Sequence, residues 1–450
     1  MIKVRLIEPS CYKFDGKLKK IKKLLIPSLT FPLLAALLPK EAQAGITNEL
    51  FEEIDFSEKP DIVGITSYSS RVLRAYEIAD EFRRKNTYVV MGGIHVSLEP
   101  LEALEHADTV IIGEAEETWP AFIRDFINSC PKKIYSASNS ASLANLPVPK
   151  FSLVDQQRYI SCAGNGIAKF LPKPTLPVQT SRGCPHACDF CSVTLFAGGR
   201  YRMRPISDVV EEIKALRLKG AFFIDDNLFA VPQRAKELFK ALIPLNIFWM
   251  GQGTLNIARD REMVRLAAKS GCIAIMAGIE SISDNSLRSV GKDINKFQDF
   301  SSQLKVFDEE GISVSALMIL GLDGEGKDIF KKTRDFLIAN KVIYSVWHPL
   351  TPFPKTAVYE RMKKDGRLKQ EKWWLEKSLA SNFLDLKFHQ INHSEADFRR
   401  QFIRYYRSFY SLANILRRIA FPPKKRILGK LIMNLILGSR VSPAGSILEN

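Results

Sequence analysis

The chain has 450 residues, of which 46% are hydrophobic and 25% are charged. A chain of this length exceeds one ordinary core, so we expect two or three globular domains. Seven cysteines in so long a chain, three of them clustered, do not form a disulfide framework; they exclude a small secreted scaffold and indicate a reducing cytoplasm. The formal net charge of +16 indicates an acidic partner, either nucleic acid or an anionic membrane surface.

A basic and then apolar stretch near the N-terminus does not predict a membrane span. Residues 17–39 begin with lysines and continue into an apolar run, which Pro27 and Pro32 interrupt. The uninterrupted parts are well short of the roughly 18–20 residues that a bilayer requires. Pro32 is instead suited to the first position of a helix over residues 33–38. The sequence therefore excludes an integral membrane protein and leaves a soluble or peripheral one.

Residues 1–150 alternate short β-branched runs with an amphipathic helix. Strands are expected at 4–7, 62–66, 88–91 and 109–112, and a helix at 72–84. This rhythm predicts a doubly wound, Rossmann-like parallel sheet, which binds ligands at the carboxyl ends of its strands. No G-x-G-x-x-G motif follows a strand, so the pattern is not that of a dinucleotide site. The candidate ligand contacts are Ser67, Tyr68, Ser69, Gly92, Gly93, His95, Gly113 and Glu114.

Three cysteines share one loop in the stretch TSRGCPHACDFCSVTLFAGGRYRMRP. Cys184, Cys188 and Cys191 are spaced as C-x3-C-x2-C, and Phe190 directly precedes the third. Clustered thiolates of this kind can hold an iron–sulfur cluster. Three ligands on a four-iron cube leave one iron open, which is typical of a catalytic centre. The alternative is a zinc site or buried thiols; a zinc ion would need a fourth ligand, and His186 lies within the loop.

After a Pro-rich linker at 151–177, residues 178–375 repeat strand and helix units. Strands are expected at 177–180, 221–224, 248–251, 272–278, 314–320 and 343–348, with helices at 206–218 and 261–269. Repeats of this kind close into a full or partial (β/α) TIM-type barrel, whose chemistry lies at the carboxyl ends of the strands. The polar residues expected at those ends are Asp225, Asp226, Asn227, Gln252, Glu280 and Ser281.

The cysteine spacing, with its aromatic residue, resembles the signature of radical S-adenosylmethionine (SAM) enzymes. The segments PDIVGITS, VVMGGIHVSLEP and TVIIGEAEETWP resemble the cobalamin-binding domain that precedes many of them. The resemblance implies three cofactors: a 4Fe-4S cluster on Cys184, Cys188 and Cys191, SAM on the open iron, and cobalamin. It also implies that FFIDDNLFA, which replaces the usual Gly-Gly-Glu, meets the methionine amine of SAM, and that GIESIS contacts its ribose.

The resemblance implies further roles in the first domain. Relatives usually lack a histidine below cobalt, so Tyr68 and its neighbours are expected nearest that face. No D-x-H-x-x-G motif is present, and His95 is expected as a loop contact to the cofactor rather than as a cobalt ligand. In the second domain, Lys355 replaces the Gly of a TPFPGT-like segment. Any left-handed turn there is expected to be relieved, or the loop to differ locally, and Lys355 is left outside the site.

The C-terminal region, residues 376–450, is expected to form a basic helical extension. Between residues 398 and 448 there are eleven Lys or Arg and no Asp or Glu. Phe402, Tyr405, Phe409, Leu412 and Leu416 recur at helical spacing. This pattern, followed by the aliphatic run 428–437, favours peripheral contact with a membrane surface; RNA binding and a helical cap packed on the barrel are the alternatives. A similar extension occurs in hopanoid C-2 methylase-type enzymes.

The combined pattern implies a cobalamin-dependent radical SAM methyltransferase that methylates an unactivated carbon, with a lipid or isoprenoid-type small molecule as the suggested substrate. The alternative within the family is cyclisation, rearrangement or oxidation without methyl transfer. An RNA methylthiotransferase would need three further cluster cysteines, which Cys11, Cys130 and Cys162 do not supply, so nucleic acid is not an expected partner. An electron donor such as ferredoxin or flavodoxin is expected, and a cytoplasmic location with membrane contact only at the tail.

Overall fold

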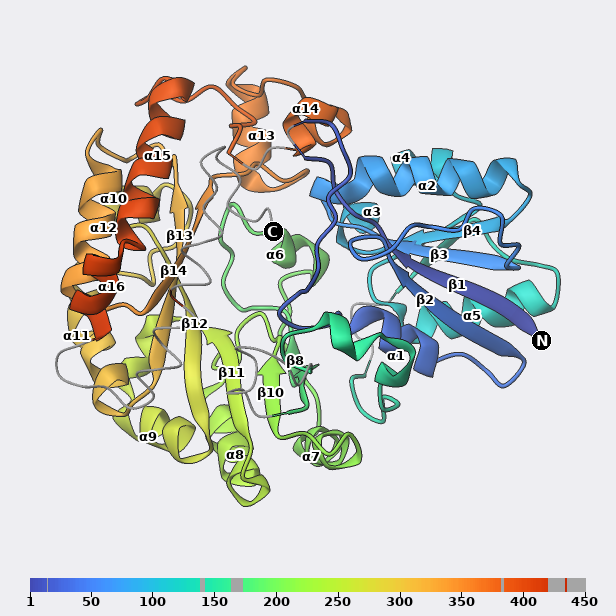
Figure 1. Cartoon of the computed structure of the whole chain (residues 1–450), viewed down its shortest axis with the longest axis horizontal. Coiled ribbons are helices and arrows are strands. Elements are labelled where there is room, and N and C mark those ends of the chain that lie inside the picture. The colour runs from blue at the N-terminus through green and yellow to red at the C-terminus, as the bar shows by residue number, and fades with distance from the viewer. Residues whose placement is uncertain (14, 138–141, 163–172, 382–383, 420–433, 435–450) are drawn as a thin grey trace.

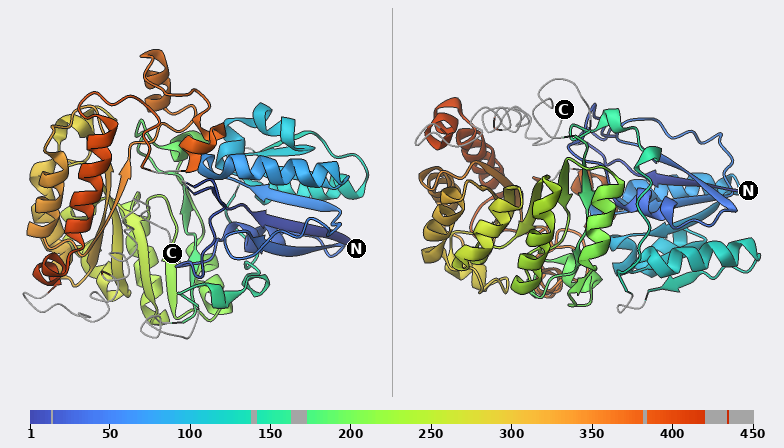
Figure 2. Two further views of the ribbon diagram at one scale, coloured as in Figure 1. Left: turned by 45° about the horizontal axis from the view of Figure 1, so that its top comes forward. Right: turned by 90° about the horizontal axis from the view of Figure 1, so that it is seen from below.

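The computed structural model describes residues 1–13, 15–137, 142–162, 173–381, 384–419 and 434. Two α/β units lie side by side, the first built on residues up to about 136 and the second on a larger curved sheet (Figure 1). The helices α15 (Glu395–Phe409) and α16 (Leu412–Ile419) lie on the outer side of the second unit, away from the first (Figure 2).

The first sheet has six parallel strands in the order β2-β1-β3-β4-β5-β6. The expected strands are present as β1 (Ile2–Glu8), β3 (Ile62–Thr66), β4 (Tyr88–Gly92) and β5 (Thr109–Ile112). The sequence did not reveal the two edge strands, β2 (Ala42–Asn48) and β6 (Ile134–Ser136). An edge strand is less buried, and the polar sequence of β2 and the three residues of β6 carry little of the apolar pattern that marks an inner strand.

Helices cover both faces of this sheet, which confirms the doubly wound fold. On one face, α1 (Thr30–Ala36) and α5 (Ala115–Ile127) share a core with the sheet. On the other lie α2 (Val72–Arg84), α3 (Ile94–Leu98) and α4 (Pro100–His106). Pro32 is the third residue of α1 rather than its first, a position that also needs no backbone N–H donor.

The second sheet is a partial barrel of six parallel strands in the order β14-β13-β12-β11-β10-β7. Its helices lie outside the curved sheet (Figure 1). Among the described strands β7 and β14 do not pair, so the barrel is open on that side. The strands are β7 (Thr175–Val178), β10 (Gly220–Phe223), β11 (Phe248–Gly253), β12 (Cys272–Glu280), β13 (Ser313–Leu320) and β14 (Tyr344–Pro349). The helices are α7 (Ile206–Ala215), α8 (Pro232–Leu242), α9 (Arg261–Lys269), α11 (Phe297–Glu309) and α12 (Ile329–Ala339).

The C-terminal helices pack on the barrel. In α15 (Glu395–Phe409) the buried stripe is Phe398, Phe402, Tyr406 and Phe409, and Trp347 of β14 meets Phe402 and Tyr406 edge-on. Helix α15 ends at Phe409 and a separate helix, α16 (Leu412–Ile419), follows, so the buried stripe does not continue through the predicted leucines. Leu412 is 60% exposed and Leu416 is 47% exposed. The predicted apolar face was therefore wrong at these two leucines. The predicted aliphatic run 428–437 lies outside the described residues except for position 434.

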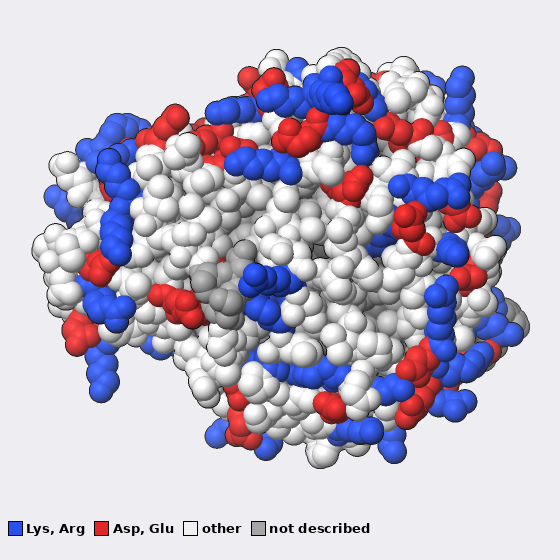
Figure 3. All heavy atoms as spheres, turned by 180° about the vertical axis from the view of Figure 1, so that it is seen from behind, with Lys and Arg blue, Asp and Glu red and all other residues white. Residues whose placement is uncertain are grey.

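On the face in Figure 3, charge is not collected in one track. On the face in Figure 3, Lys and Arg alternate with Asp and Glu around the rim, and the middle is largely uncharged. This face therefore offers no continuous basic groove of the kind that follows a phosphate backbone. In the part of the chain that the structure describes, we find no helix that combines the length and the apolar character needed to cross a bilayer.

Candidate active site

The cysteine loop is closed at its base by a small antiparallel ribbon. Strand β8 (Ser181–Arg182) pairs with β9 (Arg202–Met203), and Cys191 is the residue that precedes α6 (Ser192–Phe196). Gly183 leads from the ribbon into the loop with φ of +82°, and a Cβ there would lie 1.9 Å from the Arg200 carbonyl oxygen. Only glycine fits that close approach, so the loop entry is fixed by its sequence.

The three cysteines are free thiols; Cys188 is buried, and Cys184 and Cys191 are half-buried. Burial raises the pKa of Cys188 to about 11, with Cys191 and Cys184 adding to the shift, and burial also raises the pKa of Cys191. Within the described ranges, no three His, Cys, Asp or Glu side chains gather closely enough to share one metal ion. The thiolate ligands of a four-iron cube bind separate iron atoms, so they lie farther apart than the ligands of a single metal ion. The absence of a single-ion site among the described residues is therefore compatible with a cluster on the three cysteines.

Asp189, between the second and third cysteines, anchors the loop to the barrel. Its backbone N–H donates to the Val290 carbonyl at 3.0 Å, and its own carbonyl accepts from the Val358 N–H at 3.1 Å. Its carboxylate accepts from Arg361 Nη1 at 3.2 Å. The turn after α10 (Asp284–Arg288) and the helix α13 (Ala357–Lys364) therefore hold the middle of the cysteine loop.

The three polar residues after β10 have different roles. Asp225 is buried and accepts hydrogen bonds from the Thr180 hydroxyl at 2.7 Å and from Ser181, so it fastens β10 to the start of the cysteine loop. Burial raises the pKa of Asp225 to about 6. Asp226 accepts from the Gly183 N–H at 2.8 Å and lines a large cavity. The amide nitrogen of Asn227 lies 3.9 Å from the Cys184 sulfur.

At the end of β12, Glu280 pairs with a buried lysine that the sequence did not reveal. The Lys292 ammonium lies 3.2 Å from the Glu280 carboxylate and 6.0 Å from the centre of the Phe190 ring. Burial alone would lower the pKa of Lys292, but Glu280 and the nearby thiols outweigh it and raise that pKa. Lys292 follows the turn glycine Gly291, and no feature of the local sequence distinguishes it from a solvated lysine.

The two remaining barrel predictions lie at the same edge of the sheet. Ser281 is buried and donates to Glu325 at 3.3 Å; Glu325 also accepts the Gly321 N–H at 2.7 Å. This contact joins the loops after β12 and β13. Gln252, next to the end of β11, is half-buried, and its backbone carbonyl accepts from Leu228 at 3.0 Å.

A cavity of about 390 Å³ opens between the first sheet and the cysteine loop. Its walls come from both domains: Ser67, Tyr68, Gly92, Gly93, Gly113 and Glu114 from the first, and Arg182, Gly183, Val193 and Asp226 from the second. Tyr68 is 64% exposed and lies in this wall. The apolar side of the cavity is formed by α1 and Trp119, which the sequence did not indicate because they read as ordinary core residues. Six of the eight predicted contacts of the first domain therefore meet at one cavity.

The other two, Ser69 and His95, do not line that cavity. The His95 ring is fully buried, with Nδ1 2.9 Å from the Ser69 hydroxyl and Nε2 3.3 Å from a Glu102 carboxylate oxygen. Trp374, from the C-terminal side of the barrel, also donates to Glu102, at 2.9 Å. The prediction of His95 as a loop contact to the cofactor is not supported, because α3 directs this side chain toward α4 instead. The pairing of His95 with an acid seven residues later was the available signal.

Lys355 was expected to relieve a left-handed turn, and that expectation was wrong. Lys355 keeps φ at +61°. Its ammonium contacts the Leu98 carbonyl oxygen and lies 3.8 Å from Glu99, both in the first domain. Lys355 therefore makes a contact between the domains from a left-handed backbone conformation that glycine would adopt with less strain.

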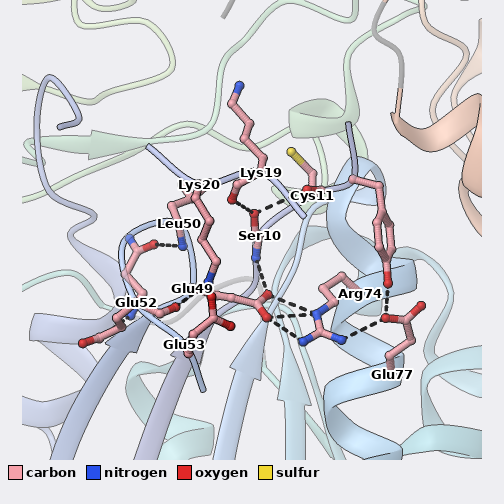
Figure 4. A network of polar contacts seen from close by, with 12 residues as sticks. Ser10, Cys11, Lys19, Lys20, Glu49, Leu50, Glu52, Glu53, Arg74 and Glu77 are labelled. Atoms are coloured by element: carbon pink, nitrogen blue, oxygen red, sulfur yellow. Dashed lines mark hydrogen bonds and ion pairs between the residues drawn. The ribbon is translucent and has the colours of Figure 1, made fainter. Parts of the chain in front are cut away.

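The loop after β1 is held in place by a partly buried ionic network (Figure 4). Glu49 is fully buried, accepts the Ser10 N–H at 3.0 Å and pairs with Arg74, whose Nη1 lies 3.0 Å from Glu77. Tyr12 contacts the same Glu77 carboxylate. The network lies at the carboxyl ends of the first-sheet strands and fixes the segment that leads to the cavity wall at Ser28 and Leu29.

Gly93 is the cavity residue whose substitution has the clearest expected effect. It has φ of +98°, and a Cβ would lie 2.3 Å from the Thr66 hydroxyl oxygen. We expect Gly93→Ala to cost about 1–3 kcal/mol in local strain and to shift the loop. The variant should remain folded by circular dichroism, but after gel filtration it should retain less than the wild type of the cobalamin that the sequence resemblance implies. Gly366→Ala is the matched control, because Gly366 has φ of +62° with no atom within 4 Å. Equal retention by all three proteins would contradict the prediction.

Comparison with known proteins supports the division seen in the structure. Residues 37–123 match the family model of the B12 binding domain, and residues 178–337 match that of the radical SAM superfamily. The chain is a cobalamin-binding radical SAM enzyme. Its cofactors are a 4Fe-4S cluster, SAM and cobalamin, as expected from the sequence.

Among curated proteins, this enzyme is similar to two from Chlorobaculum tepidum. It is 29% identical to bacteriochlorophyllide d C-12(1)-methyltransferase over 67% of this chain and 66% of that protein. It is 26% identical to bacteriochlorophyllide d C-8(2)-methyltransferase over 88% of each. The hopanoid C-2 methylase of Rhodopseudomonas palustris is 22% identical over 66% of this chain and 56% of its own length. The enzyme therefore groups with B12-dependent radical SAM methyltransferases.

A solved structure confirms the shared architecture. The radical S-adenosylmethionine methyltransferase TsrM from Kitasatospora setae matches with a TM-score of 0.66 at 18% identity, over 89% of this chain and 83% of that one. A likeness at this identity shows the fold: a cobalamin-type parallel sheet joined to an open (β/α) barrel, with helices at the C-terminal end.

Proposed function

We propose that the enzyme transfers a methyl group to an unactivated carbon, using cobalamin in the interdomain cavity and SAM beside the cysteine loop. The observation that carries this proposal is the shared cavity wall. Tyr68 and Gly93 of the first sheet line the same space as Gly183 and Asp226 next to the cysteine loop. Two cofactors held on these two walls would act on one substrate without either leaving its site.

The side chains present fit the three groups. Cys184, Cys188 and Cys191 supply three thiol ligands to the cluster, and Asp226 and Asn227 place polar groups beside them. Glu116 lines the cavity, and one of its carboxylate oxygens is buried with no hydrogen-bond partner among the described residues. The amide side chains of cobalamin are suitable donors to such an oxygen. When bound, the cluster with SAM supplies radical chemistry and cobalamin supplies a methyl group, while the protein orients them and excludes water.

The concave face of the barrel supports a bulky apolar substrate. Trp249 and Trp347 point outward into the helices, where they meet Phe239 and Tyr406. Because side chains alternate along a strand, their neighbours point to the concave face. Met250 and Val346 are such neighbours, and the strand register places Met276, Leu317 and Ile319 on the same face, with Gln252 and Ser315 as polar residues among them. The names of the relatives, bacteriochlorophyllide and hopanoid methylases, agree with a polycyclic, largely apolar substrate class.

The test is to incubate the reconstituted enzyme, under reducing conditions without oxygen, with SAM that carries a deuterated methyl group. A chlorophyllide-type tetrapyrrole and a hopanoid-type hydrocarbon serve as separate substrates. A product heavier by one labelled methyl group supports methyl transfer and identifies the substrate class. A changed substrate without label favours the alternative, a radical cyclisation or oxidation. SAM cleavage with neither product would leave the proposed substrate class wrong.

A further inference from the structure

Four charged side chains join the two domains beside the cysteine loop. Arg182 Nη1 lies 3.0 Å from Glu114 Oε2, and Arg182 also pairs with Glu116. Arg202 pairs with Glu114, with its Nη1 3.0 Å from Oε2. The two glutamates belong to the first domain and the two arginines to the second. We call these four residues the ionic bridge.

The ionic bridge is largely shielded from water. Its side chains are between 8% and 16% exposed. Two arginines and two glutamates balance in charge, so no net charge is buried. A buried ion pair adds little to stability compared with apolar packing, because removing charges from water is costly; its better attested use is to specify one arrangement over others. The ionic bridge is therefore suited to fix one relative position of the two domains.

The bridge connects the two parts of the site directly. Arg182 lies two residues before Cys184, and Arg202 is its partner across the ribbon that closes the cysteine loop. Glu114 precedes α5 and Glu116 lies in its first turn, directly after the Gly113 turn at the end of β5. Glu114, Glu116 and Arg182 all line the cavity. The base of the cysteine loop is thus tied to one wall of the proposed cobalamin site.

We propose that the ionic bridge couples the cobalamin cavity to the cysteine loop, so that a cofactor bound in the first domain orders the loop in the second. This inference rests on the proposed function for the identity of the cofactor. Glu114 and Arg202 are positioning residues in this scheme: they act on the cluster ligands through the β8–β9 ribbon. Glu114, which the sequence suggested as a cofactor contact, is held by two arginines.

The test compares Arg202→Gln with Arg202→Lys and the wild type. Removing Arg202 leaves Arg182 to pair with both glutamates, so we expect the fold to persist. Arg200→Gln is the matched control, because Arg200 is an exposed residue just before the same ribbon. Hydrogen–deuterium exchange is measured on each protein, cluster-free, with and without hydroxocobalamin. The readouts are peptides covering the Gly92–Gly93 turn and the cysteine loop, residues 183–192.

In the wild type, hydroxocobalamin should slow exchange in both peptides, the cysteine loop by about tenfold. In Arg202→Gln it should still slow exchange at the Gly92–Gly93 turn but slow the cysteine loop by only about threefold, because Arg182 alone still joins the domains. Arg202→Lys should restore most of the effect, and Arg200→Gln should match the wild type. Equal protection of the cysteine loop in Arg202→Gln, or none in the wild type, would overturn the coupling. Protection at neither site in the wild type would also overturn the proposed cobalamin site, so the two failures are distinguishable.

Discussion

Replacing Cys188 with alanine is expected to abolish cluster binding and reductive cleavage of SAM. Cys188 is the most buried of the three thiols, and it lies between the other two in the loop that Asp189 anchors. Groups that act as one unit lose their activity together, so each single alanine variant should be as inactive as the triple variant. The measurements are iron and sulfide bound per chain after reconstitution, and 5′-deoxyadenosine released from SAM under a low-potential reductant.

Cys130→Ala is the matched control for this prediction. Cys130 is an exposed free thiol in the first domain, far along the chain from the loop. Its loss should leave iron content and SAM cleavage within experimental scatter of the wild type. Cleavage that survives in the triple variant would show that the loop does not hold the cluster, and the assignment of the site would fail with it.

Glu102→Ala is expected to destabilise the contact between the domains by about 3–5 kcal/mol. The Glu102 carboxylate accepts from Tyr76 at 3.0 Å and from Trp374 at 2.9 Å, and it lies 3.1 Å from the Lys372 ammonium. Trp374 and Lys372 belong to the barrel side, so the loss of one acidic group leaves buried donors from both domains without an acceptor. Urea unfolding followed by tryptophan fluorescence measures the loss.

Two variants sharpen the test of Glu102. Glu102→Gln keeps an acceptor but removes the charge, so its destabilisation should be intermediate. Glu105→Ala alters an exposed residue on the same helix and should change the free energy of unfolding by less than about 0.5 kcal/mol. If Glu102→Ala unfolds at the same urea concentration as Glu105→Ala, the carboxylate does not stabilise the contact.

The same carboxylate predicts a dependence of stability on pH. Burial alone would raise the pKa of Glu102, but hydrogen bonds from His95, Lys372 and Trp374 outweigh it and lower the pKa from 4.5 to about 2. A carboxyl whose pKa is lowered by folding stabilises the protein above its unfolded pKa. That contribution, on the order of 3 kcal/mol, is lost as the pH falls from 4.5 toward 2. The acid transition of Glu102→Gln should therefore be shallower over this range.

Local patterns were sufficient to predict the two kinds of domain and the polar loops of the first domain that line the cavity. The inner strands β3 and β5 and the helix α2 have the predicted bounds, because buried parallel strands and amphipathic helices carry their signal within a few residues. Gly93 and Tyr68 were predicted because ligand loops follow parallel strands. These predictions needed only the order of elements along the chain.

The residues that the sequence did not reveal act across long distances. Lys292 can be recognised as a site residue only when the folded chain places it beside the cysteine loop. Arg202 can be recognised only from its contact with Glu114, which is 88 positions away in the sequence. His95 was predicted to face the cofactor, but its ring points toward Glu102. Glu102 in turn accepts a hydrogen bond from Trp374, which lies in the C-terminal part of the chain. Except for Glu102, which follows His95 by only seven residues, these partners are set by tertiary packing, which no local pattern records.

The cavity between the domains has a thermodynamic consequence. Its wall includes Tyr68 on one side and Asp226 on the other, so any ligand that touches both binds fully only when the domains are docked. By linkage, such a ligand stabilises the docked arrangement by RT ln(1 + [L]/Kd), about 2.7 kcal/mol at a free concentration of 100 Kd. A cofactor bound in this cavity therefore also stabilises the contact between the two domains. The protein should be hardest to unfold when loaded, and its cofactor should escape no faster than the domains part.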